Sequence, residues 1–313
     1  ATDELIEQRV SQVGADGRLI WDKNGSVYYV NLTEKLLATM LSKLSNFIPE
    51  GGIWMNTQRP EWNDANNALV GYGVSMVTLY YTRRYQQYLV DLFANTELEE
   101  VAISEEIEAL LRSINSTFED NKQLLAGKIN DADRKLVVDA LGEAGGDFRS
   151  SVYENDFSGN RVMLKTADLI AFLKLSLEYI DHTIEANRRE DGLYHAYNLM
   201  TATDNAVEVN YLYEMLEGQV AVLSSGYLSP EQALEVLTSL RQSAVYTARQ
   251  HSYLLYPDRE LTRYVDKNII PADQLKRSEL LQTLVSSGDT SLVEKDSQGG
   301  YHFSGAFNNV DSA

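Results

Sequence analysis

One short stretch of the chain combines the residue types of a carbohydrate site. Residues 51–71 contain Trp54 and Trp62, which are two of the three Trp in the chain, and several Asn. Two carboxylates, Glu61 and Asp64, stand three positions apart in the same stretch. Aromatic faces stack on the apolar face of a sugar ring, while amides and carboxylates form hydrogen bonds with its hydroxyls. This stretch is therefore predicted to bind a sugar.

The same stretch has the groups for acid catalysis. A protonated carboxylic acid beside a glycosidic oxygen assists departure of the leaving group. Burial against a Trp raises the pKa of a carboxyl group towards the working pH, as such an acid requires. The alternative is that Asn63 or Asp64 caps the following helix and that the two Trp belong to the core. Capping and catalysis are compatible, because a helix start concentrates hydrogen-bond donors.

A resemblance to a known family agrees with this interpretation. Trp62-Asn63-Asp64-Ala-Asn-Asn-Ala-Leu-Val-Gly71, followed by Gly73-Val74-Ser75-Met76, resembles the acid-bearing segment of cellobiose phosphorylase and its relatives. In that family a Gly-Asp-Trp-Asn-Asp-Gly-Met-Asn stretch leads into a helix with Gly and Ser. The family belongs to the six-hairpin (α/α)6 glycosidases, whose barrel of paired helices holds the site at one end.

The resemblance implies roles for individual residues. Asp64 matches the general acid, Trp62 matches directly, and Glu61 replaces an Asp that helps to bind the sugar. Arg59 and Asn63 of the same loop are also expected to contact substrate. The chain departs from the family at Pro60, where the family has Gly. It also lacks a clear Thr/Ser-Gly-rich stretch for holding phosphate, since residues 286–288 match poorly, so hydrolysis and phosphorolysis both stay open.

Two further loops carry candidate residues. Tyr194 and His195 are predicted to bind sugar hydroxyls, although a lone His among Tyr is more often a structural residue. Asp147 is a candidate for the second carboxylate of an inverting pair, which stands roughly 6.5–9.5 Å from the acid. Its alternative role is a helix cap paired with Arg149. The chain is thus predicted to be an inverting glycoside hydrolase or phosphorylase acting on an oligosaccharide or glycoside. The alternatives are a non-catalytic carbohydrate-binding module and a structural helical protein.

Helices are expected to position these loops, because apolar residues recur at three- and four-residue steps along most of the chain. Asn31 with Glu34, and Ser229 with Pro230, are start signals for two of them. The predicted fold class is all-α, a partial or complete (α/α)6 toroid with one or two short β-hairpins. Helices are predicted near residues 31–47, 73–93, 104–125, 131–145, 163–188, 206–224, 230–248 and 272–286, with hairpins at 17–30 and 291–303 and long loops at 49–71, 145–162, 189–205 and 249–271.

We expect residues 1–313 to form a single domain. A complete twelve-helix toroid needs more chain than this, and Asp64 stands near the start. The chain is therefore expected to be the C-terminal part of a longer enzyme or a reduced relative. A homo-oligomer, or an N-terminal segment of the same protein, would supply the missing hairpins.

The charge and composition of the chain argue against several classes of binding partner. The net charge is −19, from 27 basic and 46 acidic residues, which argues against binding nucleic acid. No apolar run approaches the roughly 20 residues that cross a membrane. No signal peptide is visible, so a cytoplasmic location is expected, although a leader absent from this sequence would change that. There is no Cys, and the four His lack helical ligand spacing, so neither a metal nor a cofactor is expected.

Overall fold

The computed structural model describes residues 2–22, 25–55, 69, 71–260, 262 and 268–305. The chain forms two compact units, Ala1–Pro257 and Asp258–Ala313. Their boundary falls inside the long loop predicted at residues 249–271. Every helix in the described part of the chain is too short or too polar to cross a membrane.

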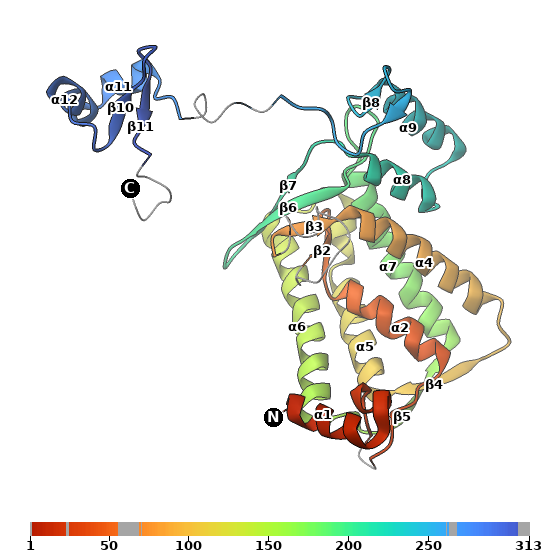
Figure 1. Ribbon diagram of the computed structural model, residues 1–313. Coiled ribbons are helices and arrows are strands. Elements are labelled where there is room, and N and C mark those ends of the chain that lie inside the picture. The colour runs from red at the N-terminus through yellow and green to blue at the C-terminus, as the bar shows by residue number, and fades with distance from the viewer. Residues whose placement is uncertain are drawn as a thin grey trace. The chain divides into compact units, whose positions relative to one another are not determined.

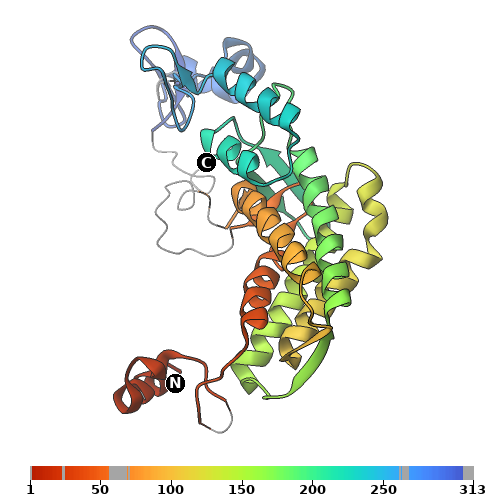
Figure 2. The same cartoon turned by 90° about the vertical axis from the view of Figure 1, so that its right-hand side faces the viewer.

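The first unit is built on long helices that run side by side (Figures 1 and 2). Helix α4 packs on α7 and α8, α5 packs on α6 and α7, and α2 packs on α5. Their apolar faces enclose one large core that includes fully buried Tyr80, Phe118 and Tyr179. The helices of this unit are α1 (Thr2–Val13), η1 (Gly14–Arg18), α2 (Leu32–Leu44), α4 (Met76–Ala94), α5 (Glu105–Asp120), η2 (Lys122–Ala126), α6 (Asp131–Asn155), α7 (Thr166–Ala186), α8 (Leu216–Ser224) and α9 (Pro230–Gln242).

Two helix starts confirm the signals in the sequence. The Asn31 side chain accepts a hydrogen bond from the Glu34 N–H at the start of α2. Ser229 caps α9 with a complete capping box, in which its side chain accepts from the Gln232 N–H and the Gln232 side chain accepts from the Ser229 N–H. Such caps satisfy N–H groups that have no partner inside the helix.

A five-stranded antiparallel sheet lies across one end of these helices (Figure 1). Its strand order is β1-β2-β3-β6-β7, so strands from distant parts of the sequence become neighbours. The strands are β1 (Phe47–Ile48), β2 (Gly52–Trp54), β3 (Gly73–Ser75), β6 (Tyr197–Ala202) and β7 (Val207–Tyr211), and two separate pairs are formed by β4 (Glu100–Ser104) with β5 (Arg161–Lys165) and by β8 (Tyr246–Thr247) with β9 (Ser252–Tyr253).

The register of this sheet aligns one row of side chains. Trp54 is paired with Val74, Val74 with Asn198, and Asn198 with Tyr211. Directly paired residues project from the same face of a sheet. With about 4.8 Å between strands, Trp54 and Tyr211 stand at the two ends of the row, about 14 Å apart.

The all-α and toroid predictions are wrong, because the structure is 54% helix and 16% strand. Gly73–Ser75 and Val207–Tyr211 were expected to be helical and are strands, and residues 197–202 were expected to lie in a loop. In segments as short as these, the spacing of the apolar residues fits a helix and a strand equally well. Their partners across the sheet, which lie far away in sequence, decide the outcome.

The predicted loop at residues 145–162 is also wrong at its start, because α6 continues to Asn155. Gly145 stands at the start of the predicted loop, yet packing requires a glycine here inside the helix. A Cβ atom at Gly145 would lie 2.8 Å from the Ser45 Cβ at the end of α2. The glycine therefore marks a close approach between two helices.

The second unit confirms the hairpin predicted at residues 291–303. Strands β10 (Val293–Lys295) and β11 (Tyr301–Phe303) are antiparallel, and helices α11 (Ala272–Arg277) and α12 (Glu279–Ser287) precede them. At the turn, Asp296 accepts hydrogen bonds from the N–H groups of Gln298 and Gly300. The hairpin predicted at 17–30 is present as a bridge between Trp21 and Val27, and residues 23–24 at its tip lie outside the described residues.

Candidate functional site

The two ends of the predicted acid-bearing loop meet at the sheet. The Met55 N–H donates to the Gly73 carbonyl at 2.9 Å, and the Gly71 N–H donates to the Met55 carbonyl at 2.7 Å. The chain therefore leaves and rejoins the sheet at one point between β2 and β3. Five predicted site residues of this loop lie outside the described residues: Arg59, Glu61, Trp62, Asn63 and Asp64.

The loop ends lie beside the segment that contains His195. Met55 and Leu69 pack against a small cluster formed by Ala196, Tyr197 and Met215. The backbone also joins the two regions, since the Met76 N–H donates to the Ala196 carbonyl at 2.9 Å. The structure thus brings the ends of one predicted site loop next to a second predicted site loop, more than a hundred residues away in the sequence.

His195 is held in one orientation and is kept neutral. Its Nδ1 lies 2.9 Å from the Leu212 carbonyl, so Nδ1 carries the proton and Nε2 is left as an acceptor. The ring stacks on Tyr211 with centroids 4.6 Å apart. Burial, followed by the nearby charge of Arg189, lowers the pKa of His195 to about 4. At neutral pH His195 can therefore accept a hydrogen bond from a hydroxyl group.

An ion-pair cluster supports the loop on the other side of His195. Arg189 pairs with Asp191 at 2.7 Å and with Glu214 at 3.3 Å. Burial tends to raise the pKa of Asp191, but hydrogen bonds from Arg189 and the Leu193 N–H lower it overall. Asp191 is thus an ionised carboxylate that holds the turn, not a proton donor.

Tyr194 points into the core instead of towards His195. Its side chain is 1% exposed, and its backbone N–H and carbonyl are both bonded to the Gln219 side chain. Its hydroxyl is buried and has no hydrogen-bond partner among the residues that the structure describes. In this conformation the ring supports the loop from inside, and only the neighbouring His195 is available to a ligand.

A cavity of about 460 Å³ adjoins Tyr211. The Tyr211 side chain is 46% exposed, and burial followed by the charge of Glu50 raises the pKa of its hydroxyl, so it stays a donor. His182 also lines this cavity; its Nε2 bonds the Gly127 carbonyl, while its Nδ1 is buried without a partner among the described residues. We call this the Tyr211 cavity; its lining residues are Glu50, Lys128, His182, Glu185, Ala186 and Tyr211.

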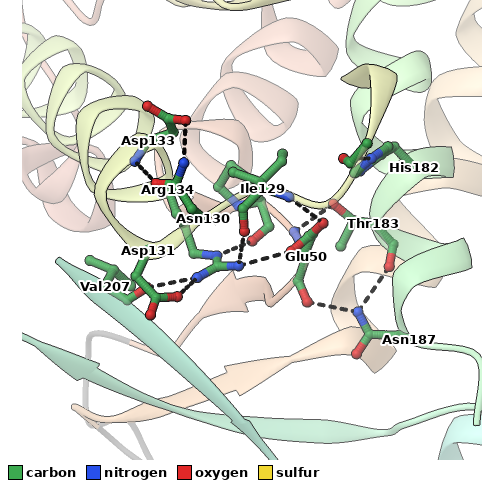
Figure 3. A network of polar contacts seen from close by, with 12 residues as sticks. Glu50, Ile129, Asn130, Asp131, Asp133, Arg134, His182, Thr183, Asn187 and Val207 are labelled. Atoms are coloured by element: carbon green, nitrogen blue, oxygen red, sulfur yellow. Dashed lines mark hydrogen bonds and ion pairs between the residues drawn. The ribbon is translucent and has the colours of Figure 1, made fainter. Parts of the chain in front are cut away.

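A buried ion pair fixes the wall of the Tyr211 cavity (Figure 3). Glu50 and Arg134 are 2% and 3% exposed, and their side chains meet at 2.8 Å. The Arg134 guanidinium has five N–H donors, and each is directed at an acceptor. Those acceptors are Glu50 and Asp131 and the carbonyls of Pro49, Ile129 and Val207.

The same pair fixes the backbone that leads to Trp54. Glu50 has a φ of 59°, which is unusual for a residue other than glycine. Its N–H donates to the Thr183 hydroxyl, its carbonyl accepts from the Asn187 side chain, and its second carboxylate oxygen accepts from the Ile129 N–H. The strained turn between β1 and β2 is therefore held by side chains of α6 and α7.

Sequence reasoning missed Glu50, Arg134 and Tyr211. One signal for Arg134 was present, because it stands on the same helical stripe as buried Val137 and Leu141. A charged residue on an apolar stripe predicts a buried partner of opposite charge. Nothing in the local sequence identifies that partner as Glu50, which is 84 positions away.

Trp54 packs against the cluster of Ile48, Val74 and Val207, as does Val138 of α6, and Asp147 lies within α6 itself. Trp54 lines a cavity of about 560 Å³, which we call the Trp54 cavity. Asp147 is exposed within α6, so the alternative of a helix cap is wrong, and it lines a smaller cavity of about 180 Å³ with Glu106. The two cavities share Leu110 and Phe148.

The described residues contain no group of three or more Asp, Glu or His placed to hold a metal ion. Residues 261–313 match the family model of GH149 phosphorylase insertion domain 2. No curated protein matches the chain. The match indicates a carbohydrate-active, phosphorylase-related protein and is consistent with a sugar substrate. It assigns no catalytic role to any residue.

The protonation of His195 leads to a test of its burial. Its pKa in the folded chain, about 4, is below the ordinary value of about 6.5, so the unfolded chain binds the proton more tightly. The contribution of neutral His195 to the free energy of unfolding is therefore fully present above pH 6.5, and it is lost as the pH falls towards 4. His195→Asn keeps a donor for the Leu212 carbonyl but does not titrate. Urea titrations measure the free energy of unfolding of the parent and the variant. The difference between the two should shrink as the pH falls from 6.5 to 4 and should stay constant above pH 7. A constant difference throughout would contradict the assignment.

Proposed function

We propose that this chain carries the acid-bearing part of an enzyme that cleaves glycosidic bonds in oligosaccharides, with Asp64 as the general acid. The observation that carries the proposal is the similarity of residues 261–313 to an insertion domain of a phosphorylase. The resemblance around residues 62–76 supports the choice of Asp64. The position of the loop ends beside His195 supports a site at this end of the sheet.

In the proposed site the loop supplies the reacting groups and the sheet supplies fixed contacts. Trp62 and Glu61 bind the sugar ring, with Arg59 and Asn63 on its hydroxyls. His195, whose Nε2 is an acceptor, and the stacked Tyr211 bind a neighbouring hydroxyl. The Glu50–Arg134 pair holds the turn from which the loop starts.

The reaction we propose is a single displacement with inversion. A nucleophile attacks the anomeric carbon from the face opposite the leaving group, and its lone pair forms the new C–O bond. The glycosidic oxygen keeps the electron pair of the broken bond and receives the proton of Asp64. Inorganic phosphate as nucleophile carries its own negative charge, whereas water needs a carboxylate base.

Phosphorolysis is the form that the observations favour. The matching family model describes an insertion domain of GH149 phosphorylases, over residues 261–313. The candidate base for hydrolysis, Asp147, is an exposed residue of α6 that lines a small cavity with Glu106. A reaction that uses phosphate does not need Asp147 as a base.

The test is product analysis with and without phosphate. The full chain is incubated with a panel of oligosaccharides, and products are followed by chromatography and ³¹P NMR. A sugar phosphate formed only when phosphate is present supports phosphorolysis, and reducing sugar formed equally without phosphate indicates hydrolysis. Calorimetric binding without any product would favour the alternative of a non-catalytic carbohydrate-binding module. If no oligosaccharide of the panel binds and none gives a product, the proposal is contradicted.

A further inference from the structure

The Trp54 cavity is a second candidate site, because none of the residues that line it has a role in the proposed reaction. It is bounded by the last turn of α2, by β1 and β2, and by the middle of α6. Its volume of about 560 Å³ is within the range of ligand pockets. Its lining includes Ser42, Lys43, Ser45, Trp54, Gly142 and Arg149.

The charge of this lining is opposite to that of the chain. It contains Lys43 and Arg149 and no Asp or Glu, in a chain with 46 acidic and 27 basic residues. Neither cation forms an ion pair within the part of the chain that the structure describes. The Tyr211 cavity, by contrast, contains Glu50 and Glu185. The Trp54 cavity therefore suits an anionic group.

The remaining lining suits a sugar ring. The Trp54 indole N–H donates to the Gly71 carbonyl at 3.0 Å, which fixes the ring plane. The hydroxyls of Ser42 and Ser45 donate to carbonyls of their own helix, so their oxygens keep lone pairs for ligand hydroxyls. An aromatic face with adjacent hydroxyl acceptors is the combination that binds a sugar.

Gly142 keeps the cavity open. It lies in the interior of α6, where glycine is less favourable than alanine. Unlike Gly145, it is not required by packing, because a Cβ atom there would meet nothing within 4 Å. A larger side chain at this position would extend into the space that a ligand needs.

From these observations we propose that the Trp54 cavity binds a sugar that carries an anionic substituent. The ring stacks on Trp54, and the anionic group lies between Lys43 and Arg149. Phosphate and carboxylate substituents share this chemistry. The proposal does not depend on Asp64 or on cleavage of any bond.

The first test is calorimetric titration of the full chain with glucose 6-phosphate and with glucuronate, which represent the two substituents. Glucose and inorganic phosphate are the comparison ligands. At least one anionic sugar should bind about tenfold or more tightly than both comparison ligands, since hydrogen bonds to charged groups contribute about 1.5–3 kcal/mol. The double variant Lys43→Gln/Arg149→Gln should remove that preference. Equal binding of glucose, or binding of phosphate alone, would overturn the proposal, as would no binding at millimolar ligand.

A matched pair of variants locates the binding. Gly142→Leu should abolish it by filling the cavity while strengthening α6. Gly146→Leu is the control, because Gly146 lies in the same helix, has nothing within 4 Å of a built Cβ and does not line the cavity. Equal binding by both variants would place the ligand elsewhere. Repeating the titration with Asp64→Asn separates the two proposals, because binding should persist in that variant whether or not it retains activity.

Discussion

Replacing Asp64 by Asn is expected to reduce cleavage of an unactivated oligosaccharide by about 10²-fold to 10⁴-fold, the range of general acid catalysis. The amide has nearly the same shape but no proton of suitable acidity to donate. Sugar affinity should change little, because Asn keeps the hydrogen-bonding capacity of the side chain. Initial rates and calorimetric affinity, measured on the same preparation, check both parts.

The leaving group supplies an independent check on the role of Asp64. The fluoride ion of a glycosyl fluoride leaves without a proton from a general acid. Asp64→Asn should therefore lose far less activity on a glycosyl fluoride than on an oligosaccharide. Asp204→Asn is the control, since Asp204 is an exposed residue at the turn between β6 and β7. Full activity of Asp64→Asn on the oligosaccharide would remove Asp64 from the mechanism. An equal loss on both substrates would assign it a binding role.

Replacing Arg134 by Met is expected to lower the free energy of unfolding of the first unit by about 3–5 kcal/mol. The variant leaves the Glu50 side chain without its partner at 2% exposure and removes all five hydrogen bonds of the guanidinium. Because total stabilities are about 5–15 kcal/mol, this loss is a large fraction of the whole. Urea unfolding followed by circular dichroism measures it.

Two further variants serve as controls for Arg134→Met. Lys135→Met changes the adjacent residue of α6, whose ion-pair partner Asp139 is half exposed, and should cost less than about 1 kcal/mol. The double variant Glu50→Gln/Arg134→Met removes the unpaired buried charge and should recover part of the loss. A loss below 1 kcal/mol for Arg134→Met would mean that the buried pair does not hold the turn.

Local signals predicted the parts of the fold that depend on neighbours in sequence. The Asn31 and Ser229 caps and the stripes of the long helices were predicted correctly, because a helix makes its hydrogen bonds within about four residues. The hairpin of the second unit was predicted for the same reason, because only a few residues join β10 to β11. The residue types of a sugar site were equally visible in the loop that contains Asp64.

The tertiary structure decided what depends on distant partners. Val74 pairs with Asn198, and Glu50 with Arg134, across separations that no periodicity encodes, so the sheet and the buried ion pair were missed. It also placed Trp54 in a positively charged cavity and brought His195 beside the ends of the loop that Trp54 precedes. The sequence alone determined which chemical groups are present. Packing and strand pairing determined which of them face the same space, because those contacts join residues far apart in the chain.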